Sequence, residues 1–171
     1  MNPLDSLLKP RSIAVIGASK RESRAGYIVM NNLLHGDFKG AVMPVTPKYD
    51  SVAGVLSYKN VSQLPITPDL AILCTHASRN IQIFKDIADK GIRSVIVLSS
   101  DMHQVTSEGT TIEFECLRIA KEHNIRVLGP NSLGIILPWI NLNASFSPVS
   151  ALPGKIAFVS SCALFVVGNL C

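Results

Sequence analysis

The chain has 171 residues, a length that allows one complete core and is short for two ordinary domains. Its net charge of +4 is too modest to indicate bulk attraction to nucleic acid, and it favours a local anionic ligand instead. No apolar run reaches the ~20 residues that span a bilayer, and the N-terminus shows no signal peptide, so we expect a cytoplasmic protein without a membrane partner. The four cysteines lack C-x-x-C spacing, and we expect them to be reduced thiols.

Apolar strands are expected at regular intervals along the chain. Six β-branched runs predict strands at 12–17, 41–46, 70–75, 94–99, 126–129 and 155–160. These runs are continuously apolar and do not alternate with polar residues, a pattern typical of strands that are covered on both faces. Segment 47–69 interrupts the series: it is rich in Pro, Ser and Asp and predicts a loop with a short helical turn near 61–64.

Helical patterns lie between several of these strands. Apolar residues recur on one face in 25–35, 78–90 and 110–123. Ser78 is the expected N-cap of the second helix, and Thr110 with Glu113 has the spacing of a capping box for the third. Repetition of strand, helix and strand implies parallel pairing, so we predict an α/β fold: a Rossmann-like doubly wound parallel sheet in a single three-layer domain.

Open parallel sheets bind ligands at the carboxyl ends of their strands, near the point where the strand order reverses. This rule directs attention to five loops, at 17–24, 46–50, 75–78, 99–104 and 129–134.

The first loop lies in "IAVIGASKRESRAGY", which runs from a strand through a glycine into a helix. Ser19 and Glu22 stand where the dinucleotide fingerprint G-x-G-x-x-G has its second and third glycines. Gly17 suits a tight turn, and the loop then offers hydroxyl and cationic side chains: Ser19, Lys20, Arg21, Ser23 and Arg24. With the free N–H groups at the following helix start, these groups predict a phosphate site; a solvated basic turn is the alternative.

The second loop bears on the identity of the ligand. NAD sites usually carry an acidic residue there to hold the ribose hydroxyls, whereas this chain has Lys48 at the corresponding place. A cation suits an extra ribose phosphate, as in NADP or coenzyme A. Asp50 as the ribose acid, and Lys48 as a plain solvent-facing lysine, are the alternatives.

The fifth loop, "LGPNSLGIILP", is a constrained turn with polar groups at Asn131 and Ser132. Its "GPNSLG" resembles the G-P-N-x-x-G motif of the succinyl-CoA synthetase alpha subunit and of the wider NDP-forming acyl-CoA synthetases. The segments "LLKPRSIAVIGAS", "PVTPK" and "TPDLAILCTHASRN" are similar to the same family. Together with "RAGY" and "LNASFSPV", the chain most resembles the inactive ligase-like region of bacterial protein lysine acetyltransferases.

The resemblance implies a Rossmann-like domain that binds coenzyme A or acetyl-CoA. It places the CoA phosphates at the first loop (Gly17, Ser19, Lys20, Arg21 and Arg24) and a CoA-binding lysine near Lys48. It places the nucleotide end near the turn that begins at Thr75, and the CoA path along the backbone of Leu98, Ser99 and Ser100. Pro130 and Asn131 would approach the pantetheine and thioester end.

After "KIAFVS", the family continues with a Ser-x-Ser-Gly helix start and a second, flavodoxin-like domain that carries a phosphorylated histidine. Here the chain reads "SSCALFVVGNLC". We therefore expect a CoA-binding domain at 1–154 and the start of a truncated flavodoxin-like domain at 155–171. The ligase or acetyltransferase domains would belong to the parent protein, and the fragment would not be catalytic alone.

Two other functions are considered. One is an NADP-binding oxidoreductase domain, although Ser19 replaces a fingerprint glycine and no Tyr-x-x-x-Lys set is present. The other is a regulatory module that senses acyl-CoA. A homo-oligomer is the alternative to a monomer.

Overall fold

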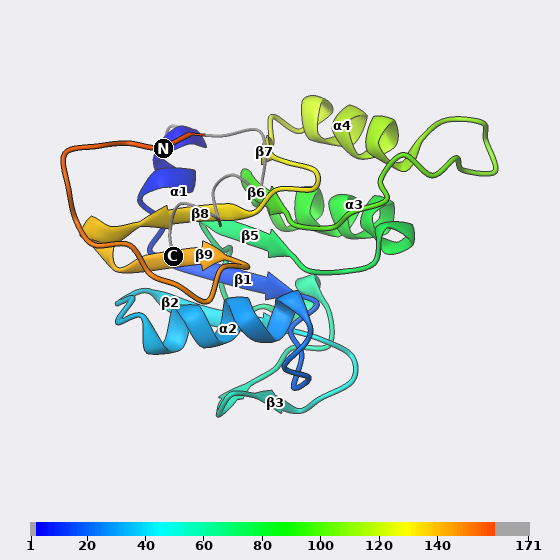
Figure 1. Ribbon diagram of the computed structural model, residues 1–171. Helices are drawn as coiled ribbons and strands as arrows, with labels where there is room; N and C mark the ends of the chain where they lie inside the picture. Colours follow the sequence, from blue (N-terminus) through cyan, green and yellow to red (C-terminus); the bar gives the residue numbers. More distant parts are fainter. Residues whose placement is uncertain (1–2, 160–171) are drawn as a thin grey trace.

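The computed structural model describes residues 3–159. Within them lies a five-stranded parallel sheet with the order β2-β1-β5-β6-β7 (Figure 1). Its strands are β1 (Ser12–Ile16), β2 (Ala41–Val45), β5 (Leu70–Leu73), β6 (Ser94–Val97) and β7 (Arg126–Leu128). The predicted α/β, Rossmann-like parallel sheet is confirmed.

Both faces of the sheet are covered, which explains why its strands read as continuous apolar runs. In β1, Ile13 and Val15 join the core on one face, while Ala14 and Ile16 join the core on the other. All five residues of this strand are buried. Alternation of side chains along a strand thus supplies two hydrophobic cores from one apolar segment.

The helices form the outer layers (Figure 1). α2 (Ala25–His35) and the short α1 (Pro3–Leu8) pack on one face, and α3 (Asn80–Lys90) and α4 (Ile112–Glu122) pack on the other. The helix predicted at 25–35 has the observed bounds. No helix of the described part of the chain is long and apolar enough to cross a membrane.

The predicted caps of α3 and α4 are wrong in detail. A 3₁₀ turn (Ala77–Arg79) precedes α3, and the side chain of His76 accepts from the Ser78 N–H, so Ser78 is not the cap. Thr111, rather than Thr110, caps α4 by accepting from the Phe114 N–H. Thr110 instead donates its hydroxyl to Glu115.

Segment 47–69 contains the expected helical turn (Val61–Gln63) and, in addition, a two-stranded hairpin of β3 (Ser51–Val52) and β4 (Val55–Leu56). A bridge between Val45 and Tyr58 holds this segment against the edge of the main sheet.

A second hairpin was not foreseen. β8 (Gly134–Leu137) and β9 (Leu142–Ser145) pair antiparallel around a 3₁₀ turn (Pro138–Ile140) and extend the layer formed by α2. The Asn32 side chain of α2 donates to the carbonyls of Ser145 and Ser147 at 2.9 and 2.8 Å. These bonds fasten the hairpin to the helix.

The strand predicted at 155–160 is wrong for 155–159, which form no strand. Ile156 is 93% exposed, and a β-branched run without a neighbouring strand gains nothing from extending. Ser160, and with it most of the expected truncated domain at 155–171, lies outside the described residues. The division at 154 therefore stays a prediction.

Candidate functional site

The strand order reverses between β1 and β5. The chain passes from β1 to β2 on one side and then crosses back to place β5 on the other side of β1. Loops that leave neighbouring strands in opposite directions open a crevice at this point, where α/β sheets bind ligands. The first and third predicted loops follow β1 and β5 and therefore flank the crevice.

Gly17 makes the first close approach at this point. Its φ is +91°, and a Cβ atom there would lie 2.8 Å from the carbonyl oxygen of Cys74. Only glycine accepts both the left-handed backbone and this spacing. The Gly17 N–H also donates to the carbonyl of Val45 at 2.9 Å, so one residue joins the ends of β1, β2 and β5.

Gly26 makes the second close approach, and the sequence analysis missed it. A Cβ atom there would lie 2.1 Å from the carbonyl oxygen of Gly17, so the first turn of α2 lies directly against the turn after β1. In dinucleotide-binding folds, the third fingerprint glycine serves this close packing of helix and strand. The fingerprint spacing predicts this glycine at the position of Glu22, whereas a glycine in the first turn of an apolar helix is the signal that points to Gly26.

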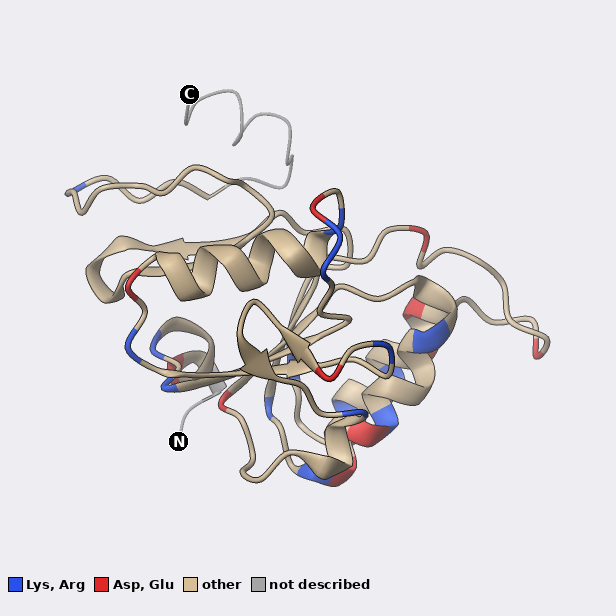
Figure 2. Cartoon of the chain, turned by 90° about the horizontal axis from the view of Figure 1, so that it is seen from below, with Lys and Arg blue, Asp and Glu red and all other residues tan. Residues whose placement is uncertain are grey.

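The loop between these glycines carries the predicted polar groups. The Ser19 hydroxyl is buried and accepts from the Arg21 N–H at 3.1 Å, which shapes the loop. Lys20, Arg21 and Arg24 are exposed, and Figure 2 shows the blue of Lys and Arg on this loop. Arg24, at the N-cap of α2, is extended and makes no side-chain cap, which leaves the helix start available to an anion.

The second loop lies against the first. The Lys20 ammonium sits 5.6 Å from the centroid of the Tyr49 ring. Lys48 is exposed, and its backbone N–H donates to the Thr46 hydroxyl at 3.4 Å. Asp50 accepts from Lys59 at 2.7 Å; this hydrogen bond, with the charges of Lys59 and Lys20, lowers the pKa of the exposed Asp50 carboxyl. Its carboxylate is thus engaged by Lys59.

The third, fourth and fifth loops are joined by direct hydrogen bonds. The buried Ser99 hydroxyl donates to the Thr75 carbonyl at 2.7 Å, and the Asn131 N–H donates to the Ser99 carbonyl at 3.1 Å. Leu98 is bonded through its N–H to the Leu73 carbonyl, and a Cβ on Gly17 would lie 3.0 Å from the Thr75 methyl group. A continuous rim therefore runs from Gly17 through Thr75 and Ser99 to Asn131.

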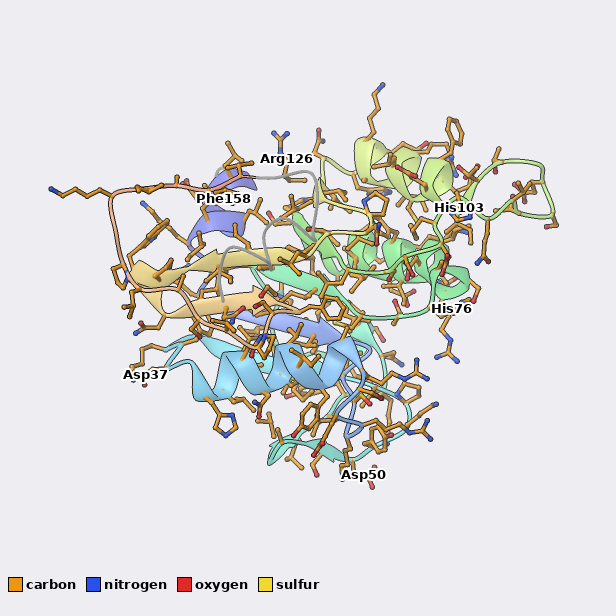
Figure 3. All side chains as sticks on the ribbon, in the orientation of Figure 1. Asp37, Asp50, His76, His103, Arg126 and Phe158 are labelled. Carbon is orange, nitrogen blue, oxygen red and sulfur yellow. The ribbon has the colours of Figure 1, made fainter. Side chains whose placement is uncertain are left out.

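Two predicted residues border this rim without joining its bonds. Ser100 is exposed and its hydroxyl donates to Asp101 at 3.0 Å, and Pro130 is half-buried beside the exposed Asn131. The side chains of His76 and His103 lie at the same end of the molecule, toward which β1 and β5 point (Figures 1 and 3).

Asn80 is a second residue that the sequence analysis missed. It is fully buried at the start of α3. Its side-chain oxygen Oδ1 accepts from the Thr75 hydroxyl at 2.6 Å, and its side-chain Nδ2 donates to Met102 Sδ at 3.0 Å. This side chain holds the third loop to the segment that follows Ser100. Nothing in the local sequence distinguishes it from an ordinary helix-start asparagine.

Two surface cavities lie away from the rim. One, of about 410 Å³, is bordered by α4 and β7, including Leu117, Lys121 and Arg126. The other, of about 280 Å³, is bordered by Asn60 and Ser62 with residues of α3. We assign the site from the topology and the joined loops, because neither cavity contains a residue of the rim.

Known proteins are similar to this chain in both sequence and fold. The model of a family described as a CoA binding domain matches residues 11–138. The chain is 36% identical over 151 residues to acetate–CoA ligase [ADP-forming] of Methanocaldococcus jannaschii, covering 88% of this chain and 21% of the relative. It is 32% identical over 161 residues to the alpha subunit of acetate–CoA ligase [ADP-forming] I of Pyrococcus furiosus, covering 92% of this chain and 35% of that subunit.

A solved structure shows the same fold. The dinucleotide forming acetyl-coenzyme A synthetase 1 of Ca. Korarchaeum cryptofilum, in complex with phosphate and ADP, superposes with a TM-score of 0.90 at 34% identity. The match covers 99% of this chain and 36% of that one. The chain thus spans about a fifth to a little over a third of these relatives, and none of the three is a protein acetyltransferase.

Proposed function

Because the chain belongs to the CoA binding domain family, we propose that it binds coenzyme A or an acyl thioester such as acetyl-CoA at the rim of loops around the β1–β5 crevice. The observation that carries this proposal is the cationic turn held at the head of α2 by two close-packed glycines. Free N–H groups, the helix dipole and three cationic side chains there suit a diphosphate.

The remaining loops suit the rest of the ligand. Lys48 is exposed beside the first loop and would hold the 3′-phosphate on the ribose. Thr75 lies next to Gly17 and would face the nucleotide end. Leu98, Ser99 and Ser100, with Pro130 and Asn131, would line the path of the pantetheine chain toward the thioester.

We further propose that this chain is the CoA-holding part of an ADP-forming acyl-CoA ligase, as the named relatives support. The chain would supply binding and no turnover, because the two hydroxyls of the rim, on Thr75 and Ser99, donate to an amide oxygen and to a backbone carbonyl, neither of which is a base that activates a nucleophile. The proposal includes a cytoplasmic location, which the free thiols of Cys74 and Cys116 support. An NADP-dependent oxidoreductase is not favoured by the family match.

Calorimetry with CoA, acetyl-CoA, NAD and NADP on the 171-residue chain tests the ligand class. We expect CoA and acetyl-CoA to bind more tightly than either nicotinamide dinucleotide. Tighter binding of NADP than of CoA would contradict the proposal.

Lys48→Ala tests the 3′-phosphate contact. Loss of a hydrogen bond to a charged group should weaken CoA binding by about 1–3 kcal/mol and spare 3′-dephospho-CoA. Lys39→Ala is the matched control, since Lys39 is an exposed lysine that precedes β2, at the opposite end of that strand. Equal losses for CoA and 3′-dephospho-CoA would remove the assignment.

A further inference from the structure

Tyr49 occupies an unusual place in the second loop. The residue is half-buried and packs against the core on the α2 side of the sheet, and this packing holds the ring in place. The Lys20 ammonium lies over the ring at 5.6 Å from the centroid. An aromatic face is therefore presented to the first loop, and an exposed cationic side chain covers it.

The chemistry of the proposed ligand brings its base to this place. In CoA one ribose carries the 3′-phosphate, the 5′-diphosphate and the adenine. If Lys48 holds the first of these and the turn of Lys20 to Arg24 holds the second, the ribose lies between the two loops. The adenine on that ribose must then lie close to both loops. Tyr49 follows Lys48 directly and is in contact with Lys20, so its ring places an aromatic surface at this junction.

We infer that Tyr49 is the platform on which the adenine of the ligand stacks, an inference that rests on the proposed function. The purine takes the position of the Lys20 ammonium over the ring, and Lys20 turns toward the phosphates. A flat π surface replaces a cation over the same face, and the cation gains an anionic partner.

This arrangement divides recognition between two residues. Stacking on an aromatic ring supports any base, because every base has a π face, and so it contributes affinity without selecting the base. Discrimination between CoA and other adenine nucleotides then falls to Lys48 and the 3′-phosphate. Substitutions at Tyr49 and Lys48 should consequently give different ligand profiles.

The test compares Tyr49→Leu with the matched control Tyr49→Phe, using CoA and 3′-dephospho-CoA as probes on the 171-residue chain. Leucine keeps apolar packing but removes the π face, whereas phenylalanine keeps both. Because both probes carry adenine, Tyr49→Leu should weaken both about tenfold and leave the ratio of their affinities unchanged. Tyr49→Phe should stay within about twofold of the wild type.

An independent readout is the NMR spectrum of the chain with ¹³C-labelled tyrosine, with Tyr49 assigned from Tyr49→Phe. Saturating CoA should shift the Tyr49 ring resonances upfield, because a stacked purine shields the ring protons. Unshifted resonances, or wild-type affinity in Tyr49→Leu, would overturn the inference while CoA binding itself stood.

A collapse of the CoA to 3′-dephospho-CoA ratio in Tyr49→Leu would also overturn it, because the substitution would then act by displacing Lys48. Failure of the wild-type chain to bind either probe would instead overturn the proposed function.

Discussion

Replacing Gly26 with alanine should disrupt the packing of α2 against the turn after β1. The added Cβ would lie 2.1 Å from the carbonyl oxygen of Gly17 and 3.1 Å from Cα of Ala18. Real Cβ atoms essentially never come within 3.0 Å of a neighbour, and both of these are backbone atoms that no rotamer change can move. α2 must therefore shift from the sheet by on the order of 1 Å.

The expected loss of stability follows from two opposing effects. Overpacking of a close-packed interface costs about 1–3 kcal/mol, and the rigid backbone contacts place this case near the upper value. Alanine recovers up to about 1 kcal/mol of helix propensity relative to glycine. The net loss in the free energy of unfolding is therefore about 2 kcal/mol, equivalent to a fall in Tm of roughly 4–8 °C for a chain of this length.

Urea unfolding of the wild type, Gly26→Ala and Gly154→Ala measures this loss. Gly154 is exposed, and a Cβ added there would meet no atom within 4 Å, so its substitution should change the free energy of unfolding by less than about 0.5 kcal/mol. CoA affinity should fall in Gly26→Ala alone, because the start of α2 is displaced from the turn. Undiminished stability and affinity in Gly26→Ala would refute the close approach as the basis of the site.

Three further predictions concern groups near the rim or on its supporting helices. Asn80→Ala removes the buried amide that accepts from the half-buried Thr75 hydroxyl and donates to Met102, and it should lower the free energy of unfolding by about 1–3 kcal/mol in urea titrations; an unchanged value would contradict the assigned bonds. Burial raises the pKa of the Cys74 and Cys116 thiols to about 12, so iodoacetamide near pH 8 should label neither residue until urea unfolds the chain. Peptide mass mapping that finds either cysteine labelled in the folded chain would disprove this. The hydrogen bond from Thr110, with the contribution of Arg118, holds the pKa of Glu115 below its ordinary 4.5. The ionised Glu115 carboxylate therefore stabilises the fold above that pH, and this stabilisation is lost as the pH falls through the lower pKa of the folded state. Glu115→Gln should make the free energy of unfolding depend less on pH in the acid range, and an unaltered pH dependence would contradict the role of Glu115.

The sheet and α2 were predictable because their signals are local. The runs that became β1, β2, β5, β6 and β7 are apolar at the positions that the two cores require. The run at 155–160 has a similar composition, yet 155–159 form no strand. A strand needs a neighbour to pair with, and composition does not report one.

The β8–β9 hairpin was missed for a related reason. Gly134 and Pro138 indicate turns when they are read locally, whereas the pairing of these strands depends on the face of α2 that they cover. Asn32, more than a hundred residues earlier in the sequence, supplies the side chain that fastens the hairpin. Such long-range complementarity leaves no periodic pattern in the sequence.

Candidate site residues divide in the same way. Cationic and glycine positions such as Gly17, Arg24 and Lys48 could be found from strand ends and charge. The roles of Gly26, Asn80 and Tyr49 depend instead on what lies opposite them: a carbonyl, the Thr75 hydroxyl and a lysine on another loop. Of these three, Gly26 alone leaves a signal in the sequence, as a glycine in the first turn of an apolar helix. The family resemblance placed residues along the rim, but only the folded chain joins Thr75, Ser99 and Asn131 by hydrogen bonds.

The altered glycine fingerprint then has a physical explanation. Gly17 and Gly26 perform the turn and the close packing of helix and strand, so the residues between them need not be small. Ser19 and Glu22 stand at the second and third glycine positions of a G-x-G-x-x-G loop, and Lys20, Arg21 and Arg24 lie around them. In the proposed site, these cationic side chains would add charge to the backbone N–H contacts with phosphate. Exposed charges are screened by salt far more than buried N–H donors are. Affinity for a phosphorylated ligand at this loop should therefore fall steeply with ionic strength, whereas a loop that binds through backbone N–H groups alone would keep most of it.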